Sequence, residues 1–211
     1  MRLDRTVAHL FELLRARVPD RDLLVVLSAD HGISETPERR AALGLPGGRH
    51  LDAAVLVREL NERLVKRFGS GADFVLGFAN PCLWIDEAKV AGLGLDLERA
   101  ERSVAALVLS SWSGYARAIA RTDLLRNSLP DGELERLVRA SFDPERTGHV
   151  YLVPEPGFIQ ADAPDELVAM HGTPYVFDRS VPIAFWGGGL RARRVHDAAD
   201  PRDIASTLAA R

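Results

Sequence analysis

The amino-acid sequence predicts an α/β fold, in which a parallel sheet lies between layers of helices and carries a small inserted α+β subdomain. Two observations predict the parallel sheet. An amphipathic helix at the start of the chain is followed, after a short loop, by a strand at 23–28 in which five of six residues are large and aliphatic. A strand without polar alternation is typical of a sheet that helices cover on both faces. A third observation, the alternation of short strands and helices between 51 and 160, predicts the inserted subdomain.

The first helix is predicted from apolar residues at helical spacing. They are Leu3, Val7, Leu10, Leu14 and Val18, with Phe11 widening the stripe. Pro19 ends this helix, and the strand of 23–28 follows after a short charged loop. A polar, irregular stretch then runs to His50, and such a stretch directly after a strand commonly shapes a site.

In the middle of the chain, apolar residues at steps of four predict a helix over 56–68. They are Leu56, Leu60, Leu64 and Phe68. The remaining elements expected there are strands at 74–79 and 82–85, a helix after Asp96, a strand at 115–121, a helix at 133–142 and a strand at 149–153. We expect residues 51–160 to form the inserted α+β subdomain.

The last part of the chain again predicts an apolar strand and a helix, as the first part does. A short apolar strand is expected at 181–186, three glycines break it at 187–189, and a helix follows over 201–211. We therefore expect residues 1–50 and 161–211 to form one core together.

Composition and charge exclude several classes of protein. The chain has 211 residues, 46% of them hydrophobic and 27% charged, which suits a globular protein with a sizeable core. A formal net charge of −3 argues against a nucleic-acid binder. No apolar stretch approaches the roughly 18 residues that span a bilayer. Cys82 is the single cysteine, so neither an internal disulfide nor a cysteine-rich metal site is expected.

Asp30 and His31 are the first candidate metal ligands. They directly follow the predicted strand, and in open α/β sheets ligands bind beyond the carboxyl ends of the strands. Carboxylate and imidazole are common Zn²⁺ ligands, and a turn at Gly32 would let both side chains reach one ion. The structural alternative is an aspartate that caps the next turn, with a histidine packed on it.

His171 is the second candidate, in the segment His-Gly-Thr-Pro-Tyr-Val-Phe-Asp-Arg-Ser-Val-Pro of residues 171–182. Gly172 and Pro174 predict an irregular loop before the last strand. Taken alone, a loop histidine held by backbone groups is the simpler interpretation. We expect no functional role for the other histidines, His9, His50, His149 and His196, and we expect His50 to face solvent.

Together, Leu-Ser-Ala-Asp-His-Gly at 27–32, the segment that begins at His171 and Asp-Ile-Ala-Ser-Thr-Leu-Ala at 203–209 resemble the alkaline phosphatase superfamily. The pattern is most similar to its type I phosphodiesterase/nucleotide pyrophosphatase branch. The resemblance implies an alkaline-phosphatase-like three-layer sandwich with two zinc ions at the carboxyl edge of its sheet. It implies that Asp30 and His31 bind one ion and that His171 binds the other.

The resemblance also implies hydrolysis of phosphate mono- or diesters through a covalent phospho-enzyme. A Thr or Ser nucleophile and an Asp-x-x-x-His pair belong to the family pattern, and this sequence contains no Asp-x-x-x-His. We therefore expect the nucleophile upstream of residue 1, in a missing N-terminal half, and no catalytic residue within this chain. By itself the chain is expected to bind zinc poorly and to be inactive.

Several alternatives stay open at this point. Manganese could replace zinc, since Asp and His serve both ions. A sulfatase-like or phosphonate hydrolase would share the metal frame. A non-catalytic remnant or interaction module would keep the fold without the chemistry. The compartment is open as well, because no signal peptide is expected in this chain, whereas relatives in the family are often periplasmic or secreted.

Overall fold

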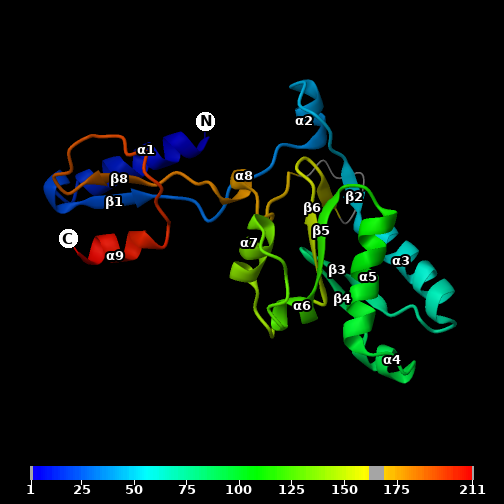
Figure 1. Ribbon diagram of the computed structural model, residues 1–211. Coiled ribbons are helices and arrows are strands. Elements are labelled where there is room, and N and C mark those ends of the chain that lie inside the picture. The colour runs from blue at the N-terminus through cyan, green and yellow to red at the C-terminus, as the bar shows by residue number, and fades with distance from the viewer. Residues whose placement is uncertain (1, 162–168, 211) are drawn as a thin grey trace. The chain divides into compact units, whose positions relative to one another are not determined.

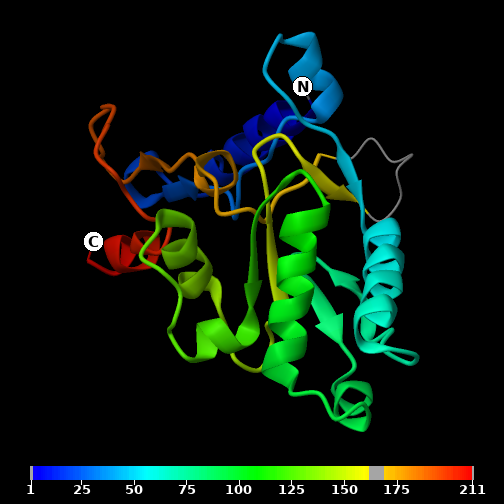
Figure 2. The same cartoon turned by 45° about the vertical axis from the view of Figure 1, so that its right-hand side comes forward.

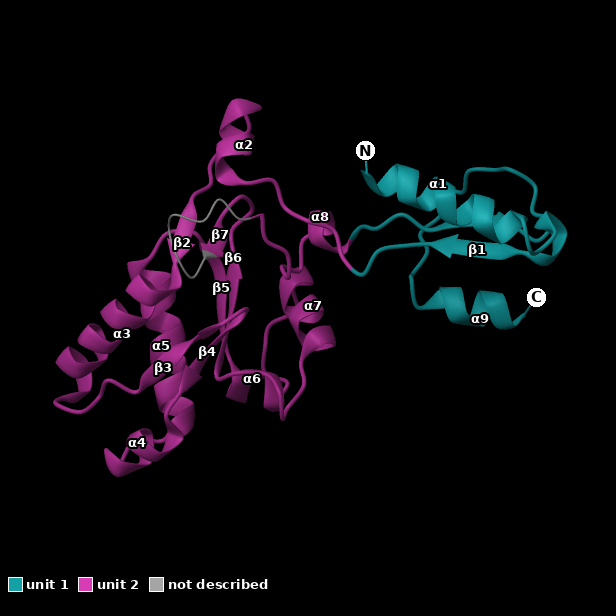
Figure 3. Cartoon of the chain, turned by 180° about the vertical axis from the view of Figure 1, so that it is seen from behind, with its two compact units in different colours: residues 1–30, 180–211 teal, residues 31–179 magenta. Residues whose placement is uncertain are grey.

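The computed structural model describes residues 2–161 and 169–210, and the chain forms two compact units. Unit 1 comprises residues 1–30 and 180–211, and unit 2 comprises residues 31–179 (Figure 3). These units are defined by compactness, and their bounds differ from those of the predicted domains, which were 1–50 with 161–211 and 51–160. The assignment of 51–160 as an inserted subdomain stays a prediction.

Unit 1 is built around a two-stranded ribbon with helices beside it (Figure 1). Its elements are α1 (Arg2–Arg15), the 3₁₀ turn η1 (Asp20–Asp22), β1 (Leu24–Leu27), β8 (Ala184–Gly187) and α9 (Asp203–Ala209). The predicted helices and strands of both chain ends are present. Phe11 of α1 meets Trp186 of β8 edge to face, with 4.8 Å between ring centroids, so the helix packs on the ribbon.

The strand β1 pairs antiparallel with β8, in the register Leu24 opposite Gly187 and Leu27 opposite Ala184. We expected this strand to lie in a parallel sheet covered on both faces. Within the described part of unit 1, β8 is its one partner, and Leu27 is 58% exposed. A two-stranded ribbon with helices beside it has too few elements to exclude water from both faces.

The glycines of 187–189 close a tight turn after β8. Gly187 has φ +93°, and a Cβ atom there would lie 2.0 Å from the carbonyl oxygen of Leu23. Gly188 donates its N–H to the same oxygen at 2.7 Å. Only glycine permits this approach of the two backbones.

Unit 2 contains a four-stranded antiparallel sheet in the order β3-β4-β6-β5. Its strands are β3 (Val75–Ala79), β4 (Cys82–Ile85), β5 (Tyr115–Ala120) and β6 (Val150–Pro154). All four were predicted within one or two residues. β3 and β4 form a hairpin through a cis Asn80–Pro81 peptide.

Helices cover both faces of this sheet (Figures 1 and 2). The described helices of unit 2 are α2 (Pro37–Ala42), α3 (Ala53–Phe68), α4 (Glu87–Gly92), α5 (Leu97–Ser111), α6 (Arg121–Leu125), α7 (Glu133–Ser141) and α8 (Val176–Arg179). Along β6 the side chains alternate: Val150 and Leu152 join the core under α3 and α5, whereas Tyr151 and Val153 join the core under α6 and α7. This period of two gives unit 2 two hydrophobic cores, one on each face.

Aspartates begin the helices of the first core. Asp52, Asp86 and Asp96 each accept a hydrogen bond from the backbone N–H three residues later. Such N-caps satisfy a donor that the helix leaves unpaired. The cap predicted at Asp96 is confirmed, and α5 follows directly.

One short parallel pair completes unit 2. β2 (His50–Asp52) pairs with β7 (Ile159–Ala161), and the sequence analysis predicted neither strand. No described helix of the chain is long and apolar enough to cross a membrane.

Candidate functional site

His31 and His171 lie face to face in unit 2, although about 140 positions separate them in the sequence. Their ring centroids are 3.5 Å apart, and their planes differ by 11°. His31 is half-buried and His171 is exposed. The structure therefore brings together two of the three predicted ligands.

Backbone hydrogen bonds hold the two histidine segments together. Gly32, next to His31, donates its N–H to the carbonyl oxygen of Asp178 at 2.7 Å. Ser34 donates its N–H and its hydroxyl to the carbonyl oxygen of Met170, at 3.1 and 2.8 Å. The stacking of the two rings thus rests on a local scaffold of the main chain.

Asp178 fixes the loop that carries His171. Its side chain is buried, and Oδ2 accepts hydrogen bonds from the N–H and the hydroxyl of Thr173, at 2.8 and 2.6 Å. The carbonyl oxygen of the same residue binds Gly32. Asp178 therefore links both histidine segments, a role that the sequence analysis missed. The sequence feature that could have indicated this role is the position of Asp178 within the 171–182 segment, which was singled out for His171.

Gly172 gives the loop its shape. Its φ of +105° is a conformation that residues with a side chain rarely adopt. Asn80, at the β3–β4 turn, donates its side-chain N–H to the carbonyl oxygen of His171 at 3.4 Å. The position of His171 thus depends on a glycine and on a neighbouring hairpin.

The tautomer of His31 follows from one contact. Its Nδ1 lies 2.7 Å from the carbonyl oxygen of Gly32. Because a carbonyl oxygen only accepts, Nδ1 carries a proton in this contact. A histidine that ligates a metal typically has this arrangement, with one nitrogen donating to a carbonyl or carboxylate.

The stacked geometry limits how these rings could hold metal ions. An ion bound to a ring nitrogen lies about 2.0–2.1 Å from it, along the lone pair and hence in the ring plane. Planes that are nearly parallel and about 3.5 Å apart cannot share one such ion. Nearly parallel planes would instead place a separate ion on each ring.

Asp30 lies at the end of the first segment of unit 1, directly before His31, and is exposed. Its role as a ligand stays a prediction. Within residues 2–161 and 169–210, no group of three or more His, Cys, Asp or Glu side chains is arranged to hold a metal ion. The described residues thus supply only part of a complete ligand set, since zinc sites use three or four protein ligands.

Two other histidines, His149 and His50, make contacts away from the pair of His31 and His171. The ring of His149 is buried: Nδ1 accepts the N–H of Ile85 at 3.0 Å, and Nε2 donates to Glu87 at 2.9 Å. That bond holds the pKa of the Glu87 carboxyl below its usual range. The expectation that His50 faces solvent is wrong, because its side chain is 14% exposed and its Nε2 lies 3.1 Å from Glu38.

Comparisons with known proteins extend this picture. No protein-family model matches the chain. A protein of Myroides odoratus named calcium-transporting ATPase is 27% identical over 99% of the chain. Alkaline phosphatase PhoK of Sphingomonas sp is 29% identical over 90%, and alkaline phosphatase PhoD of Zymomonas mobilis is 31% identical over 87%.

These similarities to named alkaline phosphatases support the resemblance to the alkaline phosphatase superfamily. The chain spans 32–37% of the length of these curated relatives, whereas the resemblance implied about a half. The crystal structure of alkaline phosphatase PafA matches with a TM-score of 0.82 at 22% identity, over 99% of this chain and 38% of that one. This match confirms the α/β fold of the superfamily.

Proposed function

We propose that this chain contributes part of the metal centre of a hydrolase that acts on phosphate mono- or diesters. The observation that carries the proposal is the facing pair of His31 and His171. Two segments far apart in the sequence, each predicted to supply a ligand, meet with nearly parallel ring planes, which supports a separate ion on each ring.

In this proposal Asp30 and His31 hold one ion and His171 holds the other. The carbonyl of Gly32 orients the ring of His31 with its Nε2 lone pair as the ligand. When bound, two zinc ions in such a centre activate a hydroxyl nucleophile and stabilise the leaving oxygen. This chain would supply ligands and their scaffold, and a segment outside it would supply the nucleophile.

The names of the relatives support this class of chemistry, since those from Sphingomonas and Zymomonas are called alkaline phosphatases. The chain covers about a third of their length, so the activity of the whole protein is itself part of the proposal. The choices between zinc and manganese, between mono- and diesters, and of the phosphodiesterase/nucleotide pyrophosphatase branch stay predictions from the resemblance.

Zinc titration of the purified chain tests the proposal. We expect Zn²⁺ to shift the ring-proton NMR signals of His31 and His171, and we expect H31A and H171A each to weaken binding at least about tenfold. The variant H9A is the matched control, because His9 is exposed on α1 and its one described partner is Glu12. Equal zinc binding by H31A, H171A and the unaltered chain would contradict the proposal.

An activity assay separates the remaining alternatives. With Zn²⁺ added, we expect the chain by itself not to hydrolyse p-nitrophenyl phosphate or bis-p-nitrophenyl phosphate. Turnover that is lost in H31A would refute the expected inactivity and support the metal role. Absence of both zinc binding and turnover would favour a non-catalytic remnant of the fold.

A further inference from the structure

A seam between α3 and α5 carries positive charge without a carboxylate partner among the described residues. The two helices lie side by side on one face of the main sheet and share one hydrophobic core (Figures 1 and 2). Arg63 and Arg67 belong to α3, and Arg99 belongs to α5. We name these three exposed residues the arginine seam.

Each guanidinium group of the arginine seam lies over an aromatic ring. The guanidinium carbon of Arg63 is 5.0 Å from the ring centroid of Trp112, at the end of α5. Those of Arg67 and Arg99 lie 5.3 and 5.8 Å from the ring centroid of Phe68. Such cation–π contacts restrain the long side chains, while their N–H groups can still donate to an anion.

The positive charge of the seam is not neutralised locally. Within the part of the chain that the structure describes, these guanidinium groups form neither an ion pair nor a hydrogen bond, and Glu59, which precedes them on α3, pairs with none of them. By contrast, Arg117 and Arg121 pair with carboxylates near α6 and α7. Arg67 and Arg99 are thus like charges held at one ring, an arrangement that an anion between them would stabilise.

The spacing along the seam favours an extended acidic peptide as that anion. Arg63 and Arg67 are one helical turn apart, which places their Cβ atoms about 5–6 Å from each other. In an extended peptide, alternate side chains point the same way and repeat about every 7 Å. Carboxylates at alternate positions could therefore each meet an arginine, and a guanidinium binds a carboxylate through two parallel hydrogen bonds.

A nucleic acid fits the seam less well than an acidic peptide. Single strands bind where their bases stack on free aromatic rings, whereas arginines already cover Phe68 and Trp112. The net charge of −3 for the whole chain also opposes a long polyanion.

We propose that the arginine seam binds an acidic, extended segment of a partner protein. The partner would place glutamate or aspartate at alternate positions along the groove between α3 and α5. None of the three arginines is a predicted metal ligand, so the inference goes beyond the proposed function and does not depend on it.

Titration with an octapeptide of alternating glutamate and glycine tests the inference. The indole N–H signal of Trp112 in NMR spectra reports binding at the seam. We expect saturable shifts with a Kd below about 1 mM at low salt. Binding should be at least about tenfold weaker in about 1 M NaCl, because salt screens exposed charges. The same peptide with glutamine in place of glutamate should not bind.

A triple variant localises the binding. R63Q/R67Q/R99Q should weaken the affinity for the octapeptide at least about tenfold, because it removes every guanidinium group of the seam. R99K keeps the charge but loses the planar fork, and it should weaken the affinity about threefold. This single variant also provides the test should the triple variant fail to fold.

A matched control separates the seam from net charge. R58Q/R136Q/R146Q removes three exposed arginines that lie outside the seam, and it should change the affinity less than about twofold. Equal losses in the two triple variants, or no saturable binding of the octapeptide to the unaltered chain, would overturn the inference. Tighter binding of inorganic polyphosphate or of phosphatidylserine vesicles than of the octapeptide would overturn the assignment of a protein segment.

Discussion

At the scale of single residues, Asp178 shows how one buried carboxylate can organise a site without being a ligand. Its side chain holds Thr173, two positions after His171, and its main chain holds Gly32, next to His31. Its other carboxylate oxygen, Oδ1, is buried without a hydrogen bond among the described residues. The bonds of its Oδ2 and of its main-chain carbonyl thus position the loop of His171 against the segment of His31.

D178N should weaken zinc binding about tenfold while the chain stays folded. The amide presents a single acceptor oxygen without charge, so the two bonds to Thr173 weaken and His171 loses its fixed position. The measurement is zinc titration with histidine NMR, and D131N, on an exposed loop, is the control. An unchanged zinc affinity in D178N would show that the loop holds its shape without this carboxylate.

Cys82 should be unreactive in the folded chain. Burial raises the pKa of the Cys82 thiol to about 11, so very little thiolate exists at pH 8. We expect its reaction with Ellman's reagent to be at least about a hundredfold slower than in the guanidinium-unfolded chain. Equal rates before and after unfolding would show that β4 opens readily.

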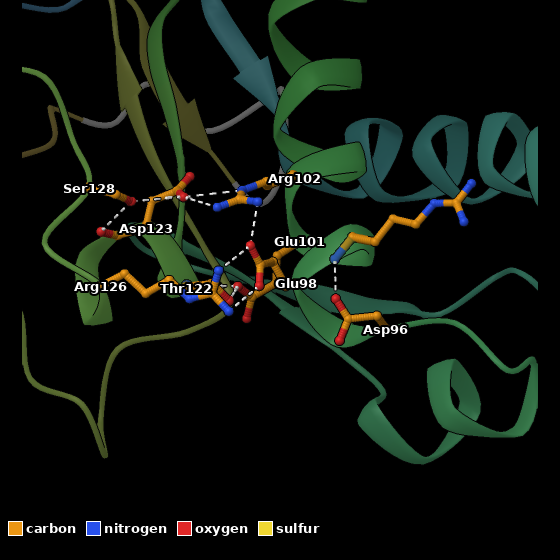
Figure 4. Close-up of polar contacts among 9 residues, drawn as sticks. Asp96, Glu98, Glu101, Arg102, Thr122, Asp123, Arg126 and Ser128 are labelled. Carbon is orange, nitrogen blue, oxygen red and sulfur yellow. Dashed lines mark hydrogen bonds and ion pairs between the residues drawn. The ribbon is translucent and has the colours of Figure 1, made fainter.

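At the scale of elements, α5 holds the start of α6 by a carboxylate. Glu101 is fully buried, and its Oε2 accepts the N–H and the hydroxyl of Thr122, at 2.8 and 2.6 Å (Figure 4). The residue before α6 is Ala120, whose methyl group cannot accept a hydrogen bond from the first turn of the helix. An acceptor from another helix therefore satisfies the first turn of α6.

Glu101→Ala should lower the free energy of unfolding by about 3 kcal/mol, because it leaves the part-buried N–H and hydroxyl of Thr122 without their acceptor and Arg121 without its ion-pair partner. Glu98→Ala, one turn away, should cost less than about 1 kcal/mol, since its partners Arg102 and Arg126 are exposed. Urea denaturation measures both. Equal losses of unfolding free energy in the two variants would mean that the buried hydrogen bonds of Glu101 contribute no more than the exposed ion pairs of Glu98.

Glu135 of α7 makes stability depend on pH. Its hydrogen bond from Arg117 holds the pKa of the Glu135 carboxyl below its usual range. A depressed carboxyl pKa stabilises the fold above the unfolded value of about 4.3, and this contribution is lost as pH falls through the folded value.

Glu135→Gln should therefore flatten the fall in stability below about pH 4, by up to about 1 kcal/mol, because Arg117 is half-exposed. Denaturant midpoints measured between about pH 3 and 7 would show this. A variant whose acid limb has the same slope as that of the unaltered chain would contradict the assignment. Glu133→Gln, on the same turn of α7, is the control.

At the scale of the whole molecule, the two units differ in how completely they exclude water. Both hydrophobic cores belong to unit 2, the magenta part of Figure 3, whereas no described residue of unit 1 is classed as buried. Burial of apolar surface is the main source of stability. The two units should therefore open with different free energies.

Limited trypsin digestion should cleave unit 1 first, at sites such as Arg17 and Arg191, and should leave a fragment within 31–179. Mass spectrometry of the early products would identify the cuts. Early cleavage inside α3 or α5 would contradict the assignment of the stable core to unit 2. Heating before digestion provides the comparison, because it should expose both units.

The sequence predicted elements well where local chemistry decides them. The steps of four in α3 and the aspartate that begins α5 reflect contacts within a few residues. The pair β2 and β7 was missed because each strand has three residues and exists only through the other. The pairing of β1 with β8 could not be predicted from the sequence either, because strand pairing depends on which segments meet in the folded chain.

By itself, the sequence determined the α/β class, the four strands of the main sheet with helices α3, α5 and α7, and the two histidines worth testing. Those features follow from periodicity, caps and short motifs. Only the tertiary structure decided that His31 and His171 face each other and that Asp178 joins their loops. The reason is physical, because distances between residues more than a hundred positions apart are set by packing and hydrogen bonds rather than by local spacing.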